Sequence, residues 1–580
     1  MNRPTSTTRS SPKGVALLVV LGVIMAIAVV SLGFMARCDT ELASGGNMAA
    51  RLQMDQLAAS GLEHARGLLL NPQEADGVFW SGDTALQLDP NSSDFYDVEV
   101  VADPNDSCTY EIAATAYRDR SGQKAAESRL EATLRLDPVV GVWTAGDLTF
   151  RQDWSARGDI YAGGSLLNLG SIDGDAFSDG LTGTITGRSN AAGALPLDWP
   201  TLSVTAFTSH YTTDLLAPGT LSSNLGPYNP ARVFYCYGNL IIQGPVTVDG
   251  MLLVADDLVI RGDGVRLLAP KNRPAVYVMG NLILHGATDL AIEGSVIVDG
   301  HVFVGHDTDV RIVGGLFAQG EIVEATLDAS GNANDAMLRN IPTWPGTGVL
   351  ELDGVDQYLR TRDHNTRLRL TSEYTLSVWV EPAAVQKSWA GILCKTGPDG
   401  DRNHWVLQFD STATELVVGH DTARWYTGIE LAELIDTMHH VAVVRQADGI
   451  VSSYLDGTLR KTLDPNIPEE LAFQNTLLIG DPGHLKIGAD RTGSGSYVYQ
   501  GRLDDVRIYA RALDAAEVAS PPDGDASLIG HWTFDATDGS QMHVAADPVR
   551  AAIETLDGTN VRHWGPAAGA FFRSVRRPQP

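Results

Sequence analysis

The segment GNLIIQG at residues 238–244 returns as GNLILHG at residues 280–286, an offset of 42 residues. A second pair, VDGMLLVADDLVI from Val248 and IEGSVIVDGHVFV from Ile292, returns after 44 residues. Each repeat holds about two short strand-turn-strand units, so one coil takes about 20 residues, as in solenoid proteins. Apolar residues alternate within these segments, which places one row inside and one row outside. The sequence therefore predicts a parallel β-helix over residues 139–330, with Ile283 pointing inward.

Polar residues in this region allow a catalytic or metal-binding interpretation. Asp256 with Asp257, or Asp307 with Asp309, could act as paired carboxylates on a polysaccharide-active β-helix. They stand where solenoid turns ordinarily place Asp and Gly, so we favour turns. Three histidines could also meet on adjacent coils, and we expect them to be unligated: His285, His301 and His306.

The stretch KGVALLVVLGVIMAIAVVSLGFMA, residues 13–36, contains 22 uncharged residues from Val15 onward. At about 1.5 Å per residue this run reaches roughly 33 Å, enough to cross a bilayer as a helix. A cleaved secretory signal has a shorter apolar core. Arg3, Arg9 and Lys13 precede the run, which predicts a cytoplasmic N-terminus and an exported remainder.

This segment resembles the N-terminus of type IV pilin-like proteins, and residues 47–70 resemble the helix that follows in PilX-type and K-type minor pilins. The resemblance implies a prepilin peptidase that cuts after Gly14 and leaves Val15 as the new N-terminus. It also implies an inner-membrane location and other pilin-like subunits as partners. Major pilins usually carry Glu at the fifth mature position, where this chain has Val19. A subunit with Val19 in place of Glu is expected at a filament tip or as a free membrane anchor rather than in the repeating body of a filament.

After the helix, three segments with a two-residue period predict antiparallel strands, which is the pilin layout: YDVEVVA, CTYEIAATAYRD and SRLEATLRLD. The four cysteines form no CxxC pair, so no zinc or redox motif is present. Cys38 and Cys108 fall within this module and are candidates for a disulfide after export, with unpaired thiols as the alternative.

A Pro-containing linker at residues 331–347 leads to the segments VLELDGVDQYLRT, YTLSVWVEP, MHHVAVVRQADGIVSSYLDGTL and LKIGADRTGSGSYVYQGRLDDVRIYARAL. Their short alternating strands and turn signals predict an antiparallel sandwich. They resemble, in order and spacing, the laminin-G-like, concanavalin A-like jelly roll. The resemblance implies a binding module for carbohydrate or protein, often with structural calcium. The matching acidic positions are Asp353, Asp356, Asp504 and Asp505.

Trp379 and Trp405 are expected in the core of this sandwich. Glucanases of the same fold need a carboxylate pattern such as ExDxxE, which RLDDVRI lacks. HExxH, GxSxG and GxxxxGK are also missing from the sequence. We therefore predict that the protein is not an enzyme.

The chain has 580 residues and a net charge of −29, so we expect no nucleic-acid partner. The predicted fold class is mainly β: a transmembrane helix with a pilin-like α+β module, a parallel β-helix, and an antiparallel jelly-roll sandwich. The expected divisions are a basic leader (1–14), a transmembrane helix (15–36), a pilin-like module (37–138), a β-solenoid (139–330), a linker (331–347), a laminin-G-like jelly roll (348–520) and a C-terminal extension without an assigned role (521–580).

Together these features predict an exported surface protein, held by a single span in the inner membrane, with its bulk periplasmic or at the cell surface. The laminin-G-like head would bind carbohydrate or a protein ligand. One alternative is a structural minor pseudopilin of a type II secretion or type IV pilus system. A third interpretation is a polysaccharide-active enzyme on the β-helix.

Overall fold

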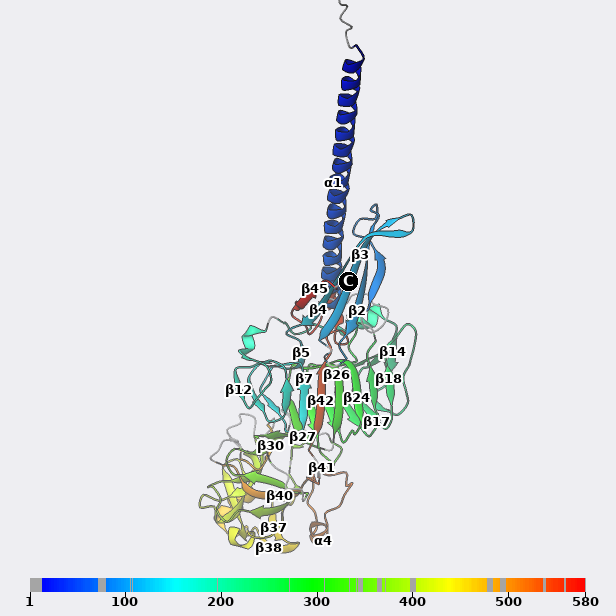
Figure 1. Cartoon of the computed structure of the whole chain (residues 1–580). Coiled ribbons are helices and arrows are strands. Elements are labelled where there is room, and N and C mark those ends of the chain that lie inside the picture. The colour runs from blue at the N-terminus through cyan, green and yellow to red at the C-terminus, as the bar shows by residue number, and fades with distance from the viewer. Residues whose placement is uncertain are drawn as a thin grey trace, which may run out of the picture. The chain divides into compact units, whose positions relative to one another are not determined.

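The structure is a computed structural model, and it describes residues 13–578 except 71–79, 105, 107, 196, 271, 307, 333, 341, 343–347, 362–367, 371, 397–402, 477–482, 491–496, 536–538 and 558–559. The chain forms two compact units. The first comprises Met1–Leu136 and Ala570–Pro580, and the second comprises Asp137–Gly569. The predicted mainly β class, with an apolar N-terminal helix, a β-solenoid and a sandwich, is confirmed (Figure 1).

The first unit packs one long helix on one sheet. Helix α1 runs from Lys13 to Leu70 without interruption. Among the described residues it is the one helix long and apolar enough to cross a membrane, with a mean hydropathy of 3.1 over 18 residues. It could therefore serve as a membrane span or signal anchor. The antiparallel sheet has the order β1 (Gly82–Leu86), β2 (Asp94–Ala102), β3 (Thr109–Arg120), β4 (Gln123–Leu136) and β45 (Ala570–Arg576).

Only the last third of α1 is buried against this sheet. The buried positions follow helical spacing and are Met54, Leu57, Ala58, Leu62, Ala65 and Leu69. At Gly61 a Cβ atom would lie 3.1 Å from both the Ala114 Cβ and the Tyr96 ring, so glycine permits the close approach of helix and sheet.

No disulfide joins Cys38 and Cys108, so that prediction is wrong for this structure. Gln53 of α1 accepts a hydrogen bond from Arg118, near the end of β3, at 2.9 Å. Cys108 precedes the opposite end of β3, roughly 33 Å away along the strand. Cys38 lies 15 residues before Gln53 on α1, roughly 22 Å in the other direction. Bridged cysteines need Cα atoms within about 7 Å.

The solenoid in the second unit has three faces of parallel strands. Along the ladder β17–β20–β23–β25–β27, one strand pairs with the next 18, 24, 20 and 20 residues later, which confirms the predicted coil length. The first face contains β13 (Ser189–Asn190), β11 (Ala176–Phe177), β8 (Asp159–Ala162), β5 (Val140–Thr144), β26 (Asp309–Ala318), β24 (Leu290–Val298), β22 (Val276–Val278), β19 (Met251–Val254), β16 (Val233–Cys236) and β14 (Thr213–Leu216).

The second face has two parts, β15 (Gly219–Leu221), β17 (Leu240–Gln243), β20 (Leu258–Arg261), β23 (Leu282–His285), β25 (Val302–Gly305) and β27 (Ile322–Thr326), and then β12 (Gly180–Thr182), β9 (Ser165–Asn168) and β6 (Leu148–Phe150). The third contains β18 (Thr247–Asp249), β21 (Arg266–Leu268), the first halves of β24 and β26, β42 (Gln541–Ala546), β7 (Trp154–Arg157) and β10 (Ser171–Asp173).

The coils are not stacked in chain order. From β5 the chain builds coils outward to β13, then crosses to the far end at β14 and stacks back until β26 pairs with β5. The crossover holds η1 (Ala192–Ala194) and α2 (Val204–His210). Together with the hairpin of β43 (Ile553–Asp557) and β44 (Asn560–Trp564), it covers the outer side of the first face.

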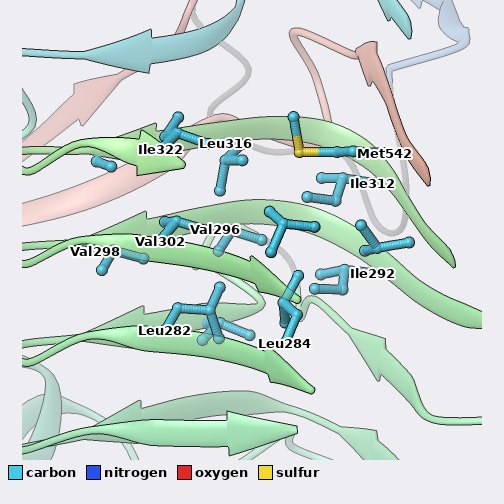
Figure 2. Close-up of a cluster of buried hydrophobic side chains, with 14 of the residues drawn as sticks. Leu282, Leu284, Ile292, Val296, Val298, Val302, Ile312, Leu316, Ile322 and Met542 are labelled. Carbon is cyan, nitrogen blue, oxygen red and sulfur yellow. The ribbon is translucent and has the colours of Figure 1, made fainter. Parts of the chain in front are cut away.

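A strand from the C-terminal extension closes the seam where the two halves of the solenoid meet. Strand β42 pairs in parallel with β26 on one side and with β7 on the other, as the red-brown strand between green and cyan strands in Figure 1 shows. Met542 and Val544 enter the solenoid interior, and Figure 2 shows Met542 beside Ile312. The extension also supplies β41 (Leu528–Trp532) to the sandwich and β45 to the first unit.

The predicted register of the repeat is wrong by one residue. Leu282 and Leu284 point into the solenoid interior (Figure 2). Ile283 points outward, yet it is only 2% exposed, because it packs in a separate cluster with Phe303 and Met337. Strand β28 (Ala336–Arg339), which lies within the expected linker, supplies Met337.

The polar residues of the solenoid serve its turns. The Asn239 side chain accepts from the Asp257 N–H, Asp257 accepts from Asn281, Asn281 accepts from the His301 N–H, and His301 Nδ1 accepts from the Glu321 N–H, at 2.9–3.0 Å. Burial lowers the pKa of His285 to about 4, with Arg261 adding to the effect. Across the described residues no group of three His, Cys, Asp or Glu side chains could hold a metal, and Asp307 lies outside them.

The head is a sandwich of two antiparallel sheets. One sheet continues the second solenoid face through β28 into β30 (Tyr358–Thr361), β39 (Leu485–Ile487), β32 (Gly391–Thr396), β33 (Asn403–Phe409), β34 (Glu415–His420) and β35 (Ala423–Glu430). The other contains β29 (Leu350–Asp353), β40 (Gln500–Tyr509), β31 (Tyr374–Pro382), β36 (His439–Arg445), β37 (Val451–Leu455) and β38 (Thr458–Thr462), with β41 beside β40. Short helices η3 (Leu431–Glu433), α3 (Pro468–Gln474) and α4 (Ala515–Ala519) complete it.

If β42 closes the seam, shortening its inward side chain should weaken the second unit. Met542→Ala removes a fully buried side chain and should lower the free energy of unfolding by about 2–5 kcal/mol. Gln541→Ala on the same strand alters an exposed side chain and should change it by less than about 0.5 kcal/mol. Denaturant unfolding of both variants in detergent is the measurement. Equal midpoints for the two variants would show that the seam contributes no stability.

Candidate ligand groove

The head carries a groove of about 820 Å³. Its floor comes from Trp379 on β31 and from the carboxylates of β40, and its walls come from residues 329–332, 523–528 and 531–535. All of these residues belong to the second unit. The C-terminal extension, which had no assigned role in the sequence, therefore supplies two of these three wall segments.

A β-bulge directs two neighbouring carboxylates into the groove. Between the pairs Ser377↔Arg507 and Trp379↔Asp504, β40 uses one residue more than β31. The bulge includes Asp505, whose φ of 45° lies in the left-handed region that non-glycine residues rarely adopt. The Asp505 N–H donates to Asp504 Oδ1 at 2.7 Å. Both aspartates therefore line the groove, whereas successive residues of a regular strand would face opposite sides.

Asp505 is held by two partners. Arg507 Nε donates to Asp505 Oδ1 at 2.8 Å, and His531 Nε2 lies 2.8 Å from the same oxygen. Burial raises the pKa of Asp505, but its bonds to His531 and Arg507 outweigh that effect and lower the pKa below its ordinary value. Arg507 also pairs with Asp523 at 2.8 Å. The Asp505 carboxylate is therefore charged, and its oxygen is occupied by bonds to Arg507 and His531 that hold the groove together.

Asp504 has the opposite electrostatic environment. Burial raises its pKa to about 7, and the neighbouring charges of Asp535 and Asp505 act in the same direction. The hydrogen bond from the Asp505 backbone N–H and the charge of Arg507 lower the pKa but do not outweigh these effects. Asp504 therefore titrates close to neutral pH and offers a carboxyl group that can accept or donate a hydrogen bond there.

Trp379 lies opposite Asp504 on the same face of the sheet. Its side chain is 37% exposed and lines the groove, so the prediction that it belongs to the core is wrong. Val378 and Val380 take the inward positions of the strand, and alternation leaves Trp379 outside. The ring packs against His440 with centroids 5.4 Å apart. Trp405 is fully buried, as predicted.

The four aspartates expected to bind calcium do not converge. In the β29–β40 ladder Asp353 lies opposite Gln500, while Asp504 follows Leu503 at the other end. The two ends are roughly 13 Å apart at about 3.3 Å per residue. Asp353 Oδ1 instead accepts from the Val355 N–H at 2.7 Å in a turn, and the Asp356 carbonyl accepts from Asn340. These residues therefore do not fit a shared calcium ion, and calcium elsewhere in the head stays a prediction.

Gly14 and Val15, the predicted cleavage junction, both lie within α1. Val15 is 59% exposed. Cleavage at this junction stays a prediction.

Sequence reasoning missed most residues of the groove, among them His531, Asp535 and Asp523. These three lie in the C-terminal extension, 27, 31 and 19 residues after Asp504, and no local motif links them to β40. The fragment LIGHWTFDATDGS resembles jelly-roll sequence and is the one local signal that could have indicated an added edge strand.

The family comparison agrees with this fold. Residues 353–519 match the laminin-G model described as the concanavalin A-like lectin/glucanases superfamily. This confirms the resemblance of the head, while the pilin-like resemblance of the N-terminus has only the helix in its support. No curated protein matches this chain.

Several solved structures are similar to part of the chain. A Trypanosoma rangeli sialidase in complex with 2,3-difluorosialic acid has 19% identity, covers 34% of this chain and 32% of its own, and has a TM-score of 0.26. A SAP-like pentraxin from Limulus polyphemus has 18% identity, coverage of 28% and 78%, and a TM-score of 0.23. A putative carbohydrate binding protein from Bacteroides ovatus has 15% identity, coverage of 36% and 54%, and a TM-score of 0.22.

The prediction that the protein is not an enzyme is contradicted, because sialidases, which are enzymes, are among the structures that match. A missing ExDxxE pattern excludes one arrangement of carboxylates and no others. This chain spans about a third of the sialidase, 32% of its length, and TM-scores of 0.26 and 0.25 assign no activity to it.

The raised pKa of Asp504 predicts a pH-dependent stability. An aspartate with a folded pKa of about 7, above its ordinary 3.8, favours the folded state when protonated, and this stability is lost as the pH rises from about 4 to about 7. Asp504→Asn, which stays neutral, should therefore melt at a higher temperature than the parent at pH 8, and this difference should shrink towards pH 4.

Asp353→Asn provides the matched control, because Asp353 lies outside the groove in a turn on the same sheet. Its effect on the melting temperature should not depend on pH between 5 and 8. Melting curves recorded across that range make the measurement. A pH-independent offset for Asp504→Asn would contradict burial of this carboxyl group.

Proposed function

We propose that this protein is a membrane-anchored, exported protein whose laminin-G-like head binds carbohydrate in the groove around Trp379. The observation that carries the proposal is an exposed tryptophan directly opposite a half-buried carboxyl group, in a groove of about 820 Å³. Tryptophan is enriched at interfaces, because its ring supplies a large apolar contact area and its N–H a polar group.

The chemistry of the groove suits a sugar. The exposed face of an indole ring packs against the apolar C–H face of a pyranose, while polar groups around it fix the orientation of the hydroxyls. Asp504 and Asp535 face the groove beside Trp379 and supply oxygen acceptors, and Asn332 and Ser330 line the same space. A protein ligand would use the same aromatic anchor, and direct binding measurements separate the two.

The charge of the groove narrows the class of sugar. Asp504, Asp505, Asp523, Asp525 and Asp535 line it, whereas Arg507 is its one permanently positive residue among those described. Arg507 is already paired with Asp505 and Asp523. Asp525 pairs with Arg511, which lies outside the lining, at 2.6 Å. An anionic ligand would still meet a lining in which carboxylates outnumber the one arginine, so neutral sugars and amino sugars are favoured over sialic or uronic acids.

The membrane anchor is supported by the exposed apolar length of α1. From Val15 to Met35 the large apolar side chains are 52–72% exposed, and none of this surface is covered within the described chain. Exposure of so much apolar surface is typical of a span or an interface between subunits. The alternative of a structural minor pseudopilin would use the same helix, with the head serving subunit packing. Calcium in the head remains a prediction of the family resemblance.

Replacement of Trp379 tests the binding proposal. The detergent-solubilised full chain is screened on a glycan array and its affinity for the strongest glycan is measured by calorimetry. Trp379→Ala should weaken binding about tenfold or more, since loss of a buried aromatic contact costs about 1.4 kcal/mol or more. Tyr426→Ala removes a 45% exposed aromatic from β35 of the other sheet and is the matched control.

Two results would contradict the proposal. One is a chain that binds no glycan although its melting curve is cooperative. The other is equal loss of affinity in Trp379→Ala and Tyr426→Ala, which would place the ligand elsewhere.

The pilin-like anchor predicts a defined mature N-terminus. If a prepilin peptidase cuts after Gly14, N-terminal sequencing of the membrane fraction should read Val15 onward while the protein stays membrane-bound. Gly14→Leu should block the cut and preserve the intact leader. An N-terminus beyond Ala36, or an intact Met1 in the unaltered protein, would reject the pilin-like assignment and leave an ordinary anchor or signal.

A further inference from the structure

The segment that walls the groove is the same segment that closes the solenoid. We call the described residues 528–535 and 539–546 the strap. Its first part contains β41, which pairs with β40 beside the bulge, and ends at Asp535 in the groove. Its second part begins at the solenoid seam and forms β42. Groove and seam thus share one stretch of backbone.

A buried ion cluster holds the strap at the entrance to the seam. Glu324 on β27 is 5% exposed, and its Oε1 accepts from the Ser540 N–H at 3.0 Å and from Ser540 Oγ at 2.8 Å. Trp154 Nε1 in turn donates to Ser540 Oγ at 2.9 Å. Arg151 Nη2 lies 2.5 Å from Glu324 Oε2, and His306 Nδ1 lies 3.7 Å from Oε1.

This cluster joins three segments of the chain. Arg151 and Trp154 belong to the first half of the solenoid, Glu324 and His306 to the second half, and Ser540 to the strap. A buried carboxylate is costly unless it is paired and hydrogen-bonded, so the seated strap supplies part of what stabilises Glu324. When the strap leaves the seam, Glu324 loses both hydrogen bonds from Ser540.

Hydrogen bonds and a buried side chain also hold the groove end of the strap in place. His531 contacts Asp505, and its N–H donates to Asp328 Oδ1 at 2.9 Å. Trp532 is fully buried, and its Nε1 donates to the Asn334 carbonyl at 3.1 Å. Five Cα steps lead from Asp535 to Ser540 in the sequence, which allows a reach of at most about 18 Å. The two ends of the strap therefore stay within this distance of each other.

We propose that the strap couples the ligand groove to the solenoid, and that Glu324 with Arg151 is the latch that keeps it seated. A ligand in the groove contacts the strap at His531 and Asp535 and favours the seated strap. By linkage, an unlatched strap presents an incomplete groove and weakens ligand binding. The ligand part of this inference rests on the proposed function, whereas the latch and its effect on the groove do not.

Hydrogen exchange of the unliganded full chain tests the latch. Glu324→Gln keeps the shape of the side chain and removes its charge. Amides of residues 541–546 should exchange at least tenfold faster, and so should those of residues 528–532 at the groove. Glu321→Gln on the same coil is the control, since the Glu321 carboxylate pairs with Arg339 at 2.7 Å. It should leave both peptides unchanged.

A milder variant keeps the test decisive if Glu324→Gln does not fold. Ser540→Ala removes the hydroxyl contacts with Glu324 and Trp154 and should accelerate exchange in the same two peptides by a smaller factor. Faster exchange in 541–546 alone would overturn the coupling, and no change in either peptide would overturn the latch. Once a glycan is identified, its saturation should slow exchange in 541–546. If no glycan binds, the proposed function fails while the exchange results still decide the coupling.

Discussion

A solenoid that is built outward from its middle must have a seam, and the pairing of β42 with β26 and β7 is the constraint on which the rest of the second unit depends. Without this strand the third face would present two strand edges with unpaired backbone groups, and the apolar interior would be open at Ile312 and Val310. Exposed edges and apolar interiors are costly in water. The strand that resolves both problems follows the sandwich strands in the chain, so the solenoid closes only after the head has been synthesised.

In sequence order, each part of the chain is inserted between two segments of another part. The sandwich lies between β27 and β42 in the sequence, and the whole second unit lies between β4 and β45. The C-terminal extension therefore adds one strand to each sheet system it returns to. Its role is structural in the seam and in the first unit, while in the head it also forms a wall of the groove. Because the same segment contributes to the seam and to the groove, the folding of the groove depends on the folding of the solenoid.

The groove illustrates how local backbone geometry produces a chemical environment. One extra residue in β40 turns Asp504 and Asp505 to the same side, and the left-handed Asp505 is stabilised by Arg507 and His531. Asp504 is left half-buried next to other carboxylates, which raises its pKa to about 7. Trp379 is exposed because alternation gives the inward positions to its neighbours. Aromatic surface and a carboxyl group that titrates near neutral pH thus meet in one place.

By itself the sequence determined the elements whose signals are local and periodic. The 42-residue repeat yielded the solenoid and its coil length, the apolar run yielded α1, and the ordered strand segments yielded the sandwich. Tertiary structure alone decided which row of the repeat faces inward, since both rows are apolar and Ile283 is covered by β28. The tertiary structure alone showed that Cys38 lies far from Cys108 and that Asp353 lies far from Asp504. These distances depend on strand direction and register, which the sequence does not specify. The tertiary structure also assigned the C-terminal extension to the seam and the groove, since pairing between strands more than 200 residues apart leaves no periodicity in the sequence.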